Sequence, residues 1–290
     1  MNLSGQMIWQ GLVNGLALGW IYVLMALGLT LIFGIMNIMQ FAHGEIYMMG
    51  AYVVYYLTAS FGFPLLPATA TSMVIMALFG VILDRFLFRR LKGQVIGPIV
   101  VSLGLTLILM SSAVVFFGLY ERSIPMLAQG SVNIFGSIVP KDRILAVAVA
   151  VLLTFCLHLF LKKSKYGQAM VATAQSPEGA ILQGISPTKM SALAWAIGCA
   201  LAAAAGALGG SLFMLGPSMG LLPLIKGLVI IVVGGMGSLP GAVLGGMILG
   251  LIDGLVPIIF GPALAALLPL LIVILVLVIR PQGLFGVEHE

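Results

Sequence analysis

The chain alternates long apolar runs with short polar segments. Because a helix needs about 20 apolar residues to cross a bilayer, each long run predicts a membrane-spanning helix. A further apolar region, 222–260, has room for two short helices joined at the glycine-rich stretch 234–241. The pattern therefore predicts an all-α, polytopic transmembrane helix bundle of eight or nine segments, some of them short or discontinuous. The other predicted spans are residues 11–33, 42–60, 67–88, 96–118, 143–161, 191–215 and 264–279.

The composition excludes a water-soluble protein. Of the 290 residues, 61% are hydrophobic and only 7% are charged, whereas a soluble domain is about 25% charged. The mean hydropathy is +1.22, and so few charged side chains cannot cover a surface that faces water. No segment is long or polar enough to form a separate soluble domain. We therefore expect residues 1–290 to form a single transmembrane domain.

The basic residues predict which side of the membrane each connection faces. Cytoplasmic loops are enriched in Lys and Arg, and nine of the thirteen such residues gather in three places. The connection 119–142 is mixed in charge, and we place it outside. Nine spans would put the N-terminus outside and eight would put it inside; the uncharged N-terminal segment leaves both open. The nine residues assigned to the cytoplasm are Arg85, Arg89, Arg90, Lys92, Lys162, Lys163, Lys165, Lys189 and Arg280.

The sequence contains no motif of a catalytic or nucleotide-binding site. It has no GxxxxGK(S/T) loop for nucleotide phosphates, and no Ser/His/Asp set, catalytic carboxylate pair or HExxH motif. Cys156 and Cys199 lie in apolar runs without the spacing of metal ligands. We therefore expect a non-enzymatic transport subunit with no catalytic residue, no metal and no cofactor in this chain. ATP hydrolysis would have to be carried out by a separate protein.

Four polar side chains crowd the segment 37–45, between the first two predicted spans. Gly34 and Gly44 weaken the helix around them. Because polar groups at membrane depth usually face the bundle interior or a cavity, one interpretation is a discontinuous helix that lines a translocation pathway. An ordinary turn with its side chains in water fits the sequence as well, and a proton relay through the histidine and glutamate is a third option. The candidate pathway residues are Asn37, Gln40, His43 and Glu45.

The polar segment 162–190 contains the pattern of a short, capped helix. Ser176 is a typical N-cap, Pro177 favours the first helical position, and Gly184 favours the end of the helix. A short helix between two helical flanks would form a compact projection through which a membrane subunit can sense a cytoplasmic motor; a solvated loop is the alternative. The candidate coupling residues are Ser176, Pro177, Glu178, Gly179, Ala180, Ile181, Leu182, Gln183 and Gly184.

Two charges fall inside the apolar C-terminal half. Lys226 and Asp253 lie in neighbouring apolar segments, where an unpaired charge is costly. They can pair with each other, face a polar cavity, or meet a partner subunit, and a structural pair is the favoured interpretation. The glycine spacings 241–245 and 246–250 permit close helix crossings, which we interpret as ordinary packing within the fold.

Several motifs between about residues 10 and 286 resemble one transporter family. Its most specific signature is similar to Phe41-Ala42-His43-Gly44-Glu45 with Met48-Met49-Gly50-Ala51-Tyr52. Further matches are Asn14-Gly15, Tyr22, Ala26-Leu27-Gly28-Leu29, Phe33-Gly34, Tyr166-Gly167, the glycine-rich stretch from Gly234 to Ala242 and the end from Arg280 to Gly286. The chain resembles the permease (H type) of the branched-chain, or hydrophobic, amino acid ABC importers. Gln40 departs from the family, which often has Asn there, so the substrate preference could differ if this position lines the pathway.

The resemblance implies a multi-pass subunit of the bacterial inner membrane that acts with several partners. These are a second, homologous permease, two cytoplasmic ATPases that bind ATP and Mg²⁺, and a periplasmic binding protein that delivers the substrate; no nucleic acid is expected. The projection at 176–184 resembles the coupling helix that contacts an ATPase. The expected function is ATP-driven import of branched-chain or other hydrophobic amino acids. Relatives that import urea, short amides or aromatic acids supply the alternative substrates.

Two other classes of protein fit the sequence and can be distinguished by experiment. An ion-coupled secondary carrier would use His43, Glu45 or Asp253 as its ion site, and it would transport without ATPases. A scaffold subunit would have no pathway, so bulky substitutions at Gly44 would leave uptake intact.

Overall fold

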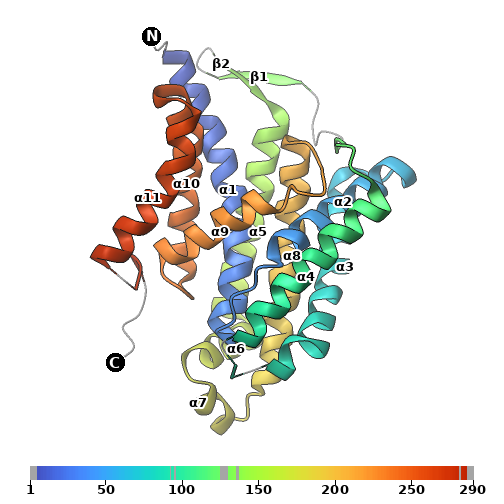
Figure 1. The fold of residues 1–290 in the computed structure, drawn as a ribbon, viewed down its shortest axis with the longest axis vertical. Helices are drawn as coiled ribbons and strands as arrows, with labels where there is room; N and C mark the ends of the chain where they lie inside the picture. The colour runs from blue at the N-terminus through green and yellow to red at the C-terminus, as the bar shows by residue number, and fades with distance from the viewer. Residues whose placement is uncertain are drawn as a thin grey trace.

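The computed structural model describes residues 5–91, 93–94, 96–124, 130–134, 137–280 and 282–285. They form a helical bundle with one short β-hairpin (Figure 1). The first half contains α1 (Gly5–Met36), α2 (His43–Phe61), α3 (Leu65–Phe86), the 3₁₀ turn η1 (Phe88–Leu91), α4 (Ile96–Phe117), β1 (Ser131–Ile134) and β2 (Ser137–Pro140). The second half contains α5 (Lys141–Lys163), α6 (Lys165–Gln175), α7 (Pro177–Leu182), α8 (Pro187–Leu212), α9 (Leu221–Gly234), α10 (Leu239–Phe260) and α11 (Pro262–Ile279).

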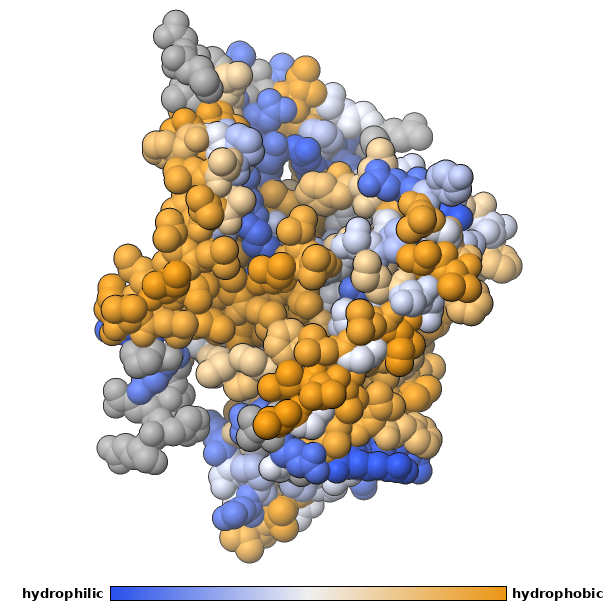
Figure 2. Space-filling model, in the orientation of Figure 1, coloured by the Kyte–Doolittle hydropathy of each residue, from blue (hydrophilic) through white to orange (hydrophobic). Residues whose placement is uncertain are grey.

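The two ends of the bundle differ in the elements that they carry. The start of α1 and the antiparallel hairpin β1–β2 lie at one end, and α6 and α7 lie at the other (Figure 1). Figure 2 shows a broad hydrophobic band between these ends, with hydrophilic residues concentrated toward both of them. The arrangement agrees with the expectation that 119–142 and 162–190 face opposite sides of a membrane.

Within the described residues, seven helices are long and apolar enough to cross a membrane, which confirms an all-α polytopic bundle. They are α1, α3 with η1, α4, α5, α8, α10 and α11. The number of segments rises to nine if α2, with 19 residues, and α9, with 14, are both counted. α2 corresponds to the predicted span 42–60, and α9 to the first of the two short helices predicted in 222–260; α9 and α10 separate at 235–238, within the expected stretch.

The centre of the bundle is built on small residues of α1 and α8. Of the most apolar window of each of these helices, 72% is buried inside the protein. A Cβ atom added at Gly206 of α8 would lie 2.0 Å from the backbone oxygen of Tyr47 in α2, and one at Gly250 of α10 would lie 2.2 Å from Cα of Gly19 in α1. Small residues let helix backbones meet this closely in membranes. Of the glycine spacings of α10, 246–250 therefore serves packing against α1, whereas 241–245 serves packing against α9.

The outer helices bury much less of their surface. Only 22% of the most apolar window of α4 and 11% of that of α11 is buried, and apolar side chains such as Val115 and Val278 are 78% and 79% exposed. Apolar surface of this extent marks contact with lipid or another protein. The chain thus consists of a tightly packed centre around α1 and α8 and a periphery whose outer face is uncovered.

Candidate functional site

The break between α1 and α2 is created by a left-handed residue. Asn37 has φ of +54°, and its N–H donates to the carbonyl oxygen of Phe33 at 2.7 Å. Asn tolerates this conformation better than most residues, so it ends a helix at this position. The side chain of Asn37 is exposed. The structure therefore separates this candidate pathway residue from the other three.

Gln40, His43 and Glu45 lie in the protein interior, with exposed fractions of 1%, 0% and 3%. His43 Nδ1 lies 3.3 Å from Gln40 Oε1, and the histidine ring packs against Gly28 of α1. In the part of the chain that the structure describes, Nε2 of Gln40 and Oε2 of Glu45 have no hydrogen-bond partner. Because buried polar groups are nearly always paired, these two orphaned atoms mark an unusual site rather than a solvated turn.

The polar segment meets the start of α9. A Cβ atom at Gly44 would lie 2.4 Å from the backbone oxygen of Gly220, and one at Gly220 would lie 2.2 Å from that of Gly44. Gly220 is the N-cap of α9, and Gly44 is in the first turn of α2. Two helix N-termini are therefore in backbone contact inside the bundle, the arrangement expected of discontinuous helices at a binding site in a transporter.

Gln40 also lines a small cavity between α1, α9 and the connection to α2. Its volume of about 10 Å³ is enough for a single water molecule, so it does not admit an amino acid. The remaining lining is apolar: Leu29, Phe33, Ile38, Met39, Leu228, Ile231 and Val232.

The segment 176–184 forms the capped helix that the sequence predicts. Ser176 accepts a hydrogen bond from the Gly179 N–H at 3.1 Å, Pro177 begins α7, and Gly184 has φ of +74°. α7 lies at one extreme of the molecule (Figure 1). Of its apolar side chains, Ile181 is 58% and Leu182 is 86% exposed. A rigid helix that presents two leucine-sized side chains to the surroundings is suited to docking in a groove of another protein.

Lys226 and Asp253 form the ion pair that was the favoured interpretation. Lys226 Nζ on α9 donates to Oδ1 of Asp253 on α10 at 2.7 Å. Tyr22 of α1 donates its hydroxyl to Oδ2 of the same carboxylate at 2.8 Å. The side chains of the lysine and the aspartate are 16% and 14% exposed. Three helices thus converge on one carboxylate that is close to the protein surface.

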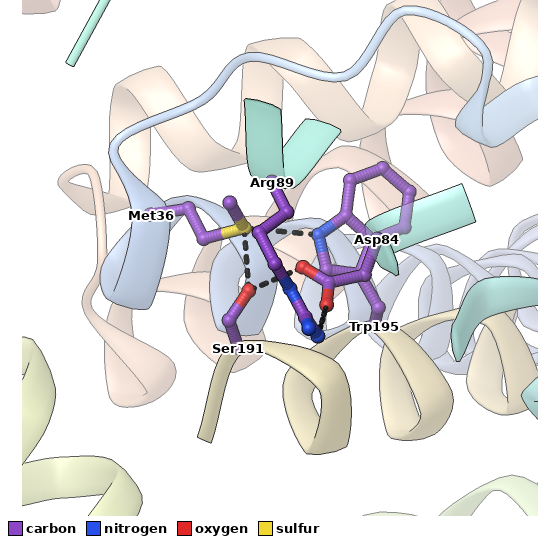
Figure 3. Close-up of polar contacts among 5 residues, drawn as sticks. All are labelled: Met36, Asp84, Arg89, Ser191 and Trp195. Carbon is purple, nitrogen blue, oxygen red and sulfur yellow. Dashed lines mark hydrogen bonds and ion pairs between the residues drawn. The ribbon is translucent and has the colours of Figure 1, made fainter. Parts of the chain in front are cut away.

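A second polar cluster, around Asp84, was not predicted from the sequence. Asp84 is fully buried; its Oδ1 accepts from the Ser191 hydroxyl at 2.5 Å and its Oδ2 from Arg89 Nη2 at 2.6 Å. Met36, the last residue of α1, accepts at its sulfur from Trp195 Nε1 at 3.1 Å. Figure 3 shows the five side chains converging from α1, α3 with η1, and α8.

This cluster ties the end of α1 to the helix that follows the exposed projection. Ser191 is in the first turns of α8, which begins three residues after Gly184. Trp195 also packs against Phe88 with ring centroids 4.5 Å apart. The signal in the sequence was an aspartate inside the predicted span 67–88, which ought to have been given a buried partner. Its partner Ser191 is 107 residues away, too far for any local pattern to identify.

A backbone bridge connects two loops on the side of the bundle away from α7. Arg122 and Leu215 exchange two N–H···O bonds of 2.9 and 2.8 Å. The Arg122 guanidinium donates to the Phe117 carbonyl at 2.8 Å and to the Tyr56 hydroxyl at 3.2 Å. These contacts join the loop after α4 to the loop that leads into α9.

Comparison with known proteins gives a consistent result. Residues 11–277 match the model of the branched-chain amino acid transport system / permease component family. The chain is 34% identical to the high-affinity branched-chain amino acid transport system permease protein BraD of Pseudomonas aeruginosa, over 96% of this chain and 95% of the relative. It is 30% identical to the permease protein LivH of Escherichia coli K12, again over 96% and 95%.

A weaker similarity connects the chain to a second type of permease. It is 25% identical to the permease protein LivM of Salmonella typhimurium, over 84% of this chain and 63% of that relative. No solved structure matches the chain. The motifs, the polytopic helical fold and the near full-length matches lead to one conclusion: the chain belongs to the family of permease components of branched-chain amino acid transport systems, and it is of the H type.

Proposed function

We propose that this chain is the membrane-spanning subunit of an ATP-driven importer for branched-chain or other hydrophobic amino acids. A periplasmic binding protein delivers the substrate, and the complex resides in the bacterial inner membrane. The permease switches between outward-open and inward-open states, and ATP binding to two partner ATPases drives the switch. Such coupling requires contacts that differ between the two states.

The observation that carries this proposal is the exposed helix α7. Its cap, its two exposed apolar side chains and its position at the end of the bundle favour docking to a cytoplasmic protein. The sequence has no phosphate-binding loop of its own. A separate ATPase that receives residues 176–184 in a groove therefore supplies the energy, with Mg²⁺ and ATP bound on that partner.

The similarity to LivM supports a second, homologous permease as the neighbour in the membrane. Its docking would cover part of the exposed apolar surface of the outer helices. The names of the relatives support branched-chain amino acids as substrates. The buried Gln40, His43 and Glu45 support a pathway beside the N-termini of α2 and α9.

The test is uptake by the reconstituted importer, with the ATPases, second permease and binding protein that accompany this chain. Ile181→Glu/Leu182→Glu places two charges on the docking face without disturbing the core, because both side chains are exposed. We expect uptake of labelled leucine to fall at least about tenfold, the effect of losing about 1.4 kcal/mol of contact energy, while the chain still inserts and folds.

The matched control is Ile138→Glu in β2, an isoleucine with 65% exposure at the opposite end of the bundle. It should leave the coupling of ATP hydrolysis to uptake unchanged. Normal coupling in the α7 variant would refute the docking assignment. Import by proteoliposomes that contain this chain and no ATPase would instead identify an ion-coupled carrier.

A further inference from the structure

The Lys226–Asp253 pair has unused bonding capacity. An ammonium group has three N–H donors, and in the described part of the chain Nζ of Lys226 contacts a single partner, Asp253. The carboxylate accepts from Lys226 and from Tyr22. The donors of Lys226 are therefore only partly used within the described residues.

The pair is also close to the surface of an apolar part of the molecule. Its side chains are 16% and 14% exposed, although Asp253 lies in a helix long and apolar enough to cross a membrane and Lys226 in a shorter apolar helix. Contact between such charges and lipid tails is costly, so charged residues at this depth face a partner, a cavity or a pathway. The exposed part of the pair is thus available to a polar molecule that enters the protein.

The charges of the pair are complementary to those of an amino acid. A zwitterion carries one ammonium and one carboxylate on adjacent groups, so its carboxylate can bind Lys226 while its ammonium binds Asp253. This exchange replaces one ion pair with two and leaves the net charge of the site at zero. The protein has already removed much of the water from its own two charges, so binding has to desolvate mainly the ligand.

An apolar surface adjoins the pair on the same helix. Leu222 is one turn before Lys226 on the same face of α9 and is 70% exposed, and Ile225 is 42% exposed. An aliphatic side chain can pack there once the charged groups of the ligand are paired. Urea has no ammonium and no carboxylate, and an aromatic acid without an amino group has only the carboxylate. Neither can therefore pair with both Lys226 and Asp253.

We propose that Lys226 and Asp253, with Tyr22 orienting the aspartate, bind the zwitterionic backbone of an apolar amino acid during its passage. In the absence of substrate the two side chains pair with each other. This inference rests on the proposed transport function and adds to it the residues that bind the substrate and the groups of the substrate that they recognise.

The decisive variant replaces both charges with apolar residues of similar size, Lys226→Met/Asp253→Leu. Exchange of a buried ion pair for packed apolar residues is often neutral for stability, so we expect the complex to assemble normally. Uptake of labelled leucine by the reconstituted importer should fall about 10- to 100-fold, the effect of losing a charge-assisted hydrogen bond. Uptake at the rate of the unmodified importer would show that the pair is structural, and would overturn the proposal.

Should the double variant not assemble, Lys226→Gln and Lys226→Arg decide the question. Per assembled complex, we expect the arginine variant to import leucine within a few-fold of the unmodified importer and the glutamine variant to be at least about tenfold slower. Equal uptake by these two variants would overturn the proposal. Failure of the proposed function itself looks different, because the unmodified complex would then import no leucine at all.

Discussion

Two ion pairs of the described chain differ in whether their carboxylate is accessible. Asp84 is fully buried and both of its oxygens are bonded, by Ser191 and Arg89, so that only the arginine side chain, 37% exposed, reaches the surface. Asp253 and Lys226 are both partly exposed, and the lysine has donors to spare. A molecule from outside can therefore reach one charge of the first pair but both charges of the second.

The difference shows that a charge inside a membrane protein has two distinct uses. A pair with a fully buried carboxylate fixes the relative position of helices, since any displacement leaves a buried charge unpaired. A pair whose two charges are both partly exposed can exchange partners at little cost. The pair that includes Asp84 therefore predicts effects on stability, and the pair that includes Asp253 predicts effects on transport.

The largest expected effect comes from Trp195→Ala, which breaks the cluster around Asp84. Trp195 is fully buried, packs on Phe88 and donates to Met36. Its removal leaves a cavity and should destabilise the protein by about 3–5 kcal/mol, measured by thermal unfolding of the purified protein in detergent. Phe116→Ala is the control, because Phe116 is 77% exposed on α4. Equal shifts in the two variants would contradict the packing role of Trp195.

An intermediate effect, and the sharpest comparison, comes from the two isosteric variants Asp84→Asn and Asp253→Asn. The first weakens charge-assisted bonds from Arg89 and Ser191 and should cost about 1–3 kcal/mol of stability, with unchanged uptake per assembled complex. The second should lower leucine uptake with a smaller loss of stability. Thermal unfolding and uptake are measured for both. A fall in uptake with Asp84→Asn equal to that with Asp253→Asn would erase the distinction between the pairs.

The smallest effect is expected from Tyr22→Phe. The variant removes one hydrogen bond to Asp253 and keeps the aromatic ring. Because the carboxylate is partly exposed, water can replace the lost donor, and the stability should fall by about 1 kcal/mol or less. Leucine uptake should change less than with Asp253→Asn. A larger loss of uptake than in the aspartate variant would make the tyrosine, rather than the ion pair, the main contact of the substrate.

Local patterns in the sequence predicted the features that depend on neighbouring residues. Long apolar runs predicted the helices, Ser176 and Pro177 predicted the start of α7, and the glycine-rich stretch predicted the break after α9. The Lys226–Asp253 pair was predicted because an unpaired charge in an apolar segment is costly, and each of these two charges is the other's nearest available partner in the adjacent segment.

The features that depend on contacts between distant segments were not predictable. Nothing near Asp84 in the sequence indicates Ser191, and nothing near Gly44 indicates Gly220. The sequence did not decide whether Gln40 and Glu45 are buried. A polar segment between two spans has the same composition whether it lies in water or inside a bundle. Asn37 was grouped with them by proximity, although its left-handed backbone turns the chain and leaves its side chain exposed.

The contact between Gly44 and Gly220 has an electrostatic consequence. Each helix N-terminus carries about half a positive elementary charge, so the starts of α2 and α9 repel each other across their point of contact. The field of both dipoles is strongest at that point, where there is little solvent to screen it. Glu45, in the first turn of α2 and next to Gly44, brings the nearest formal negative charge along the chain. The packing of the surrounding helices therefore holds the two helix starts in contact, and a negative charge on Glu45 would reduce the repulsion between them.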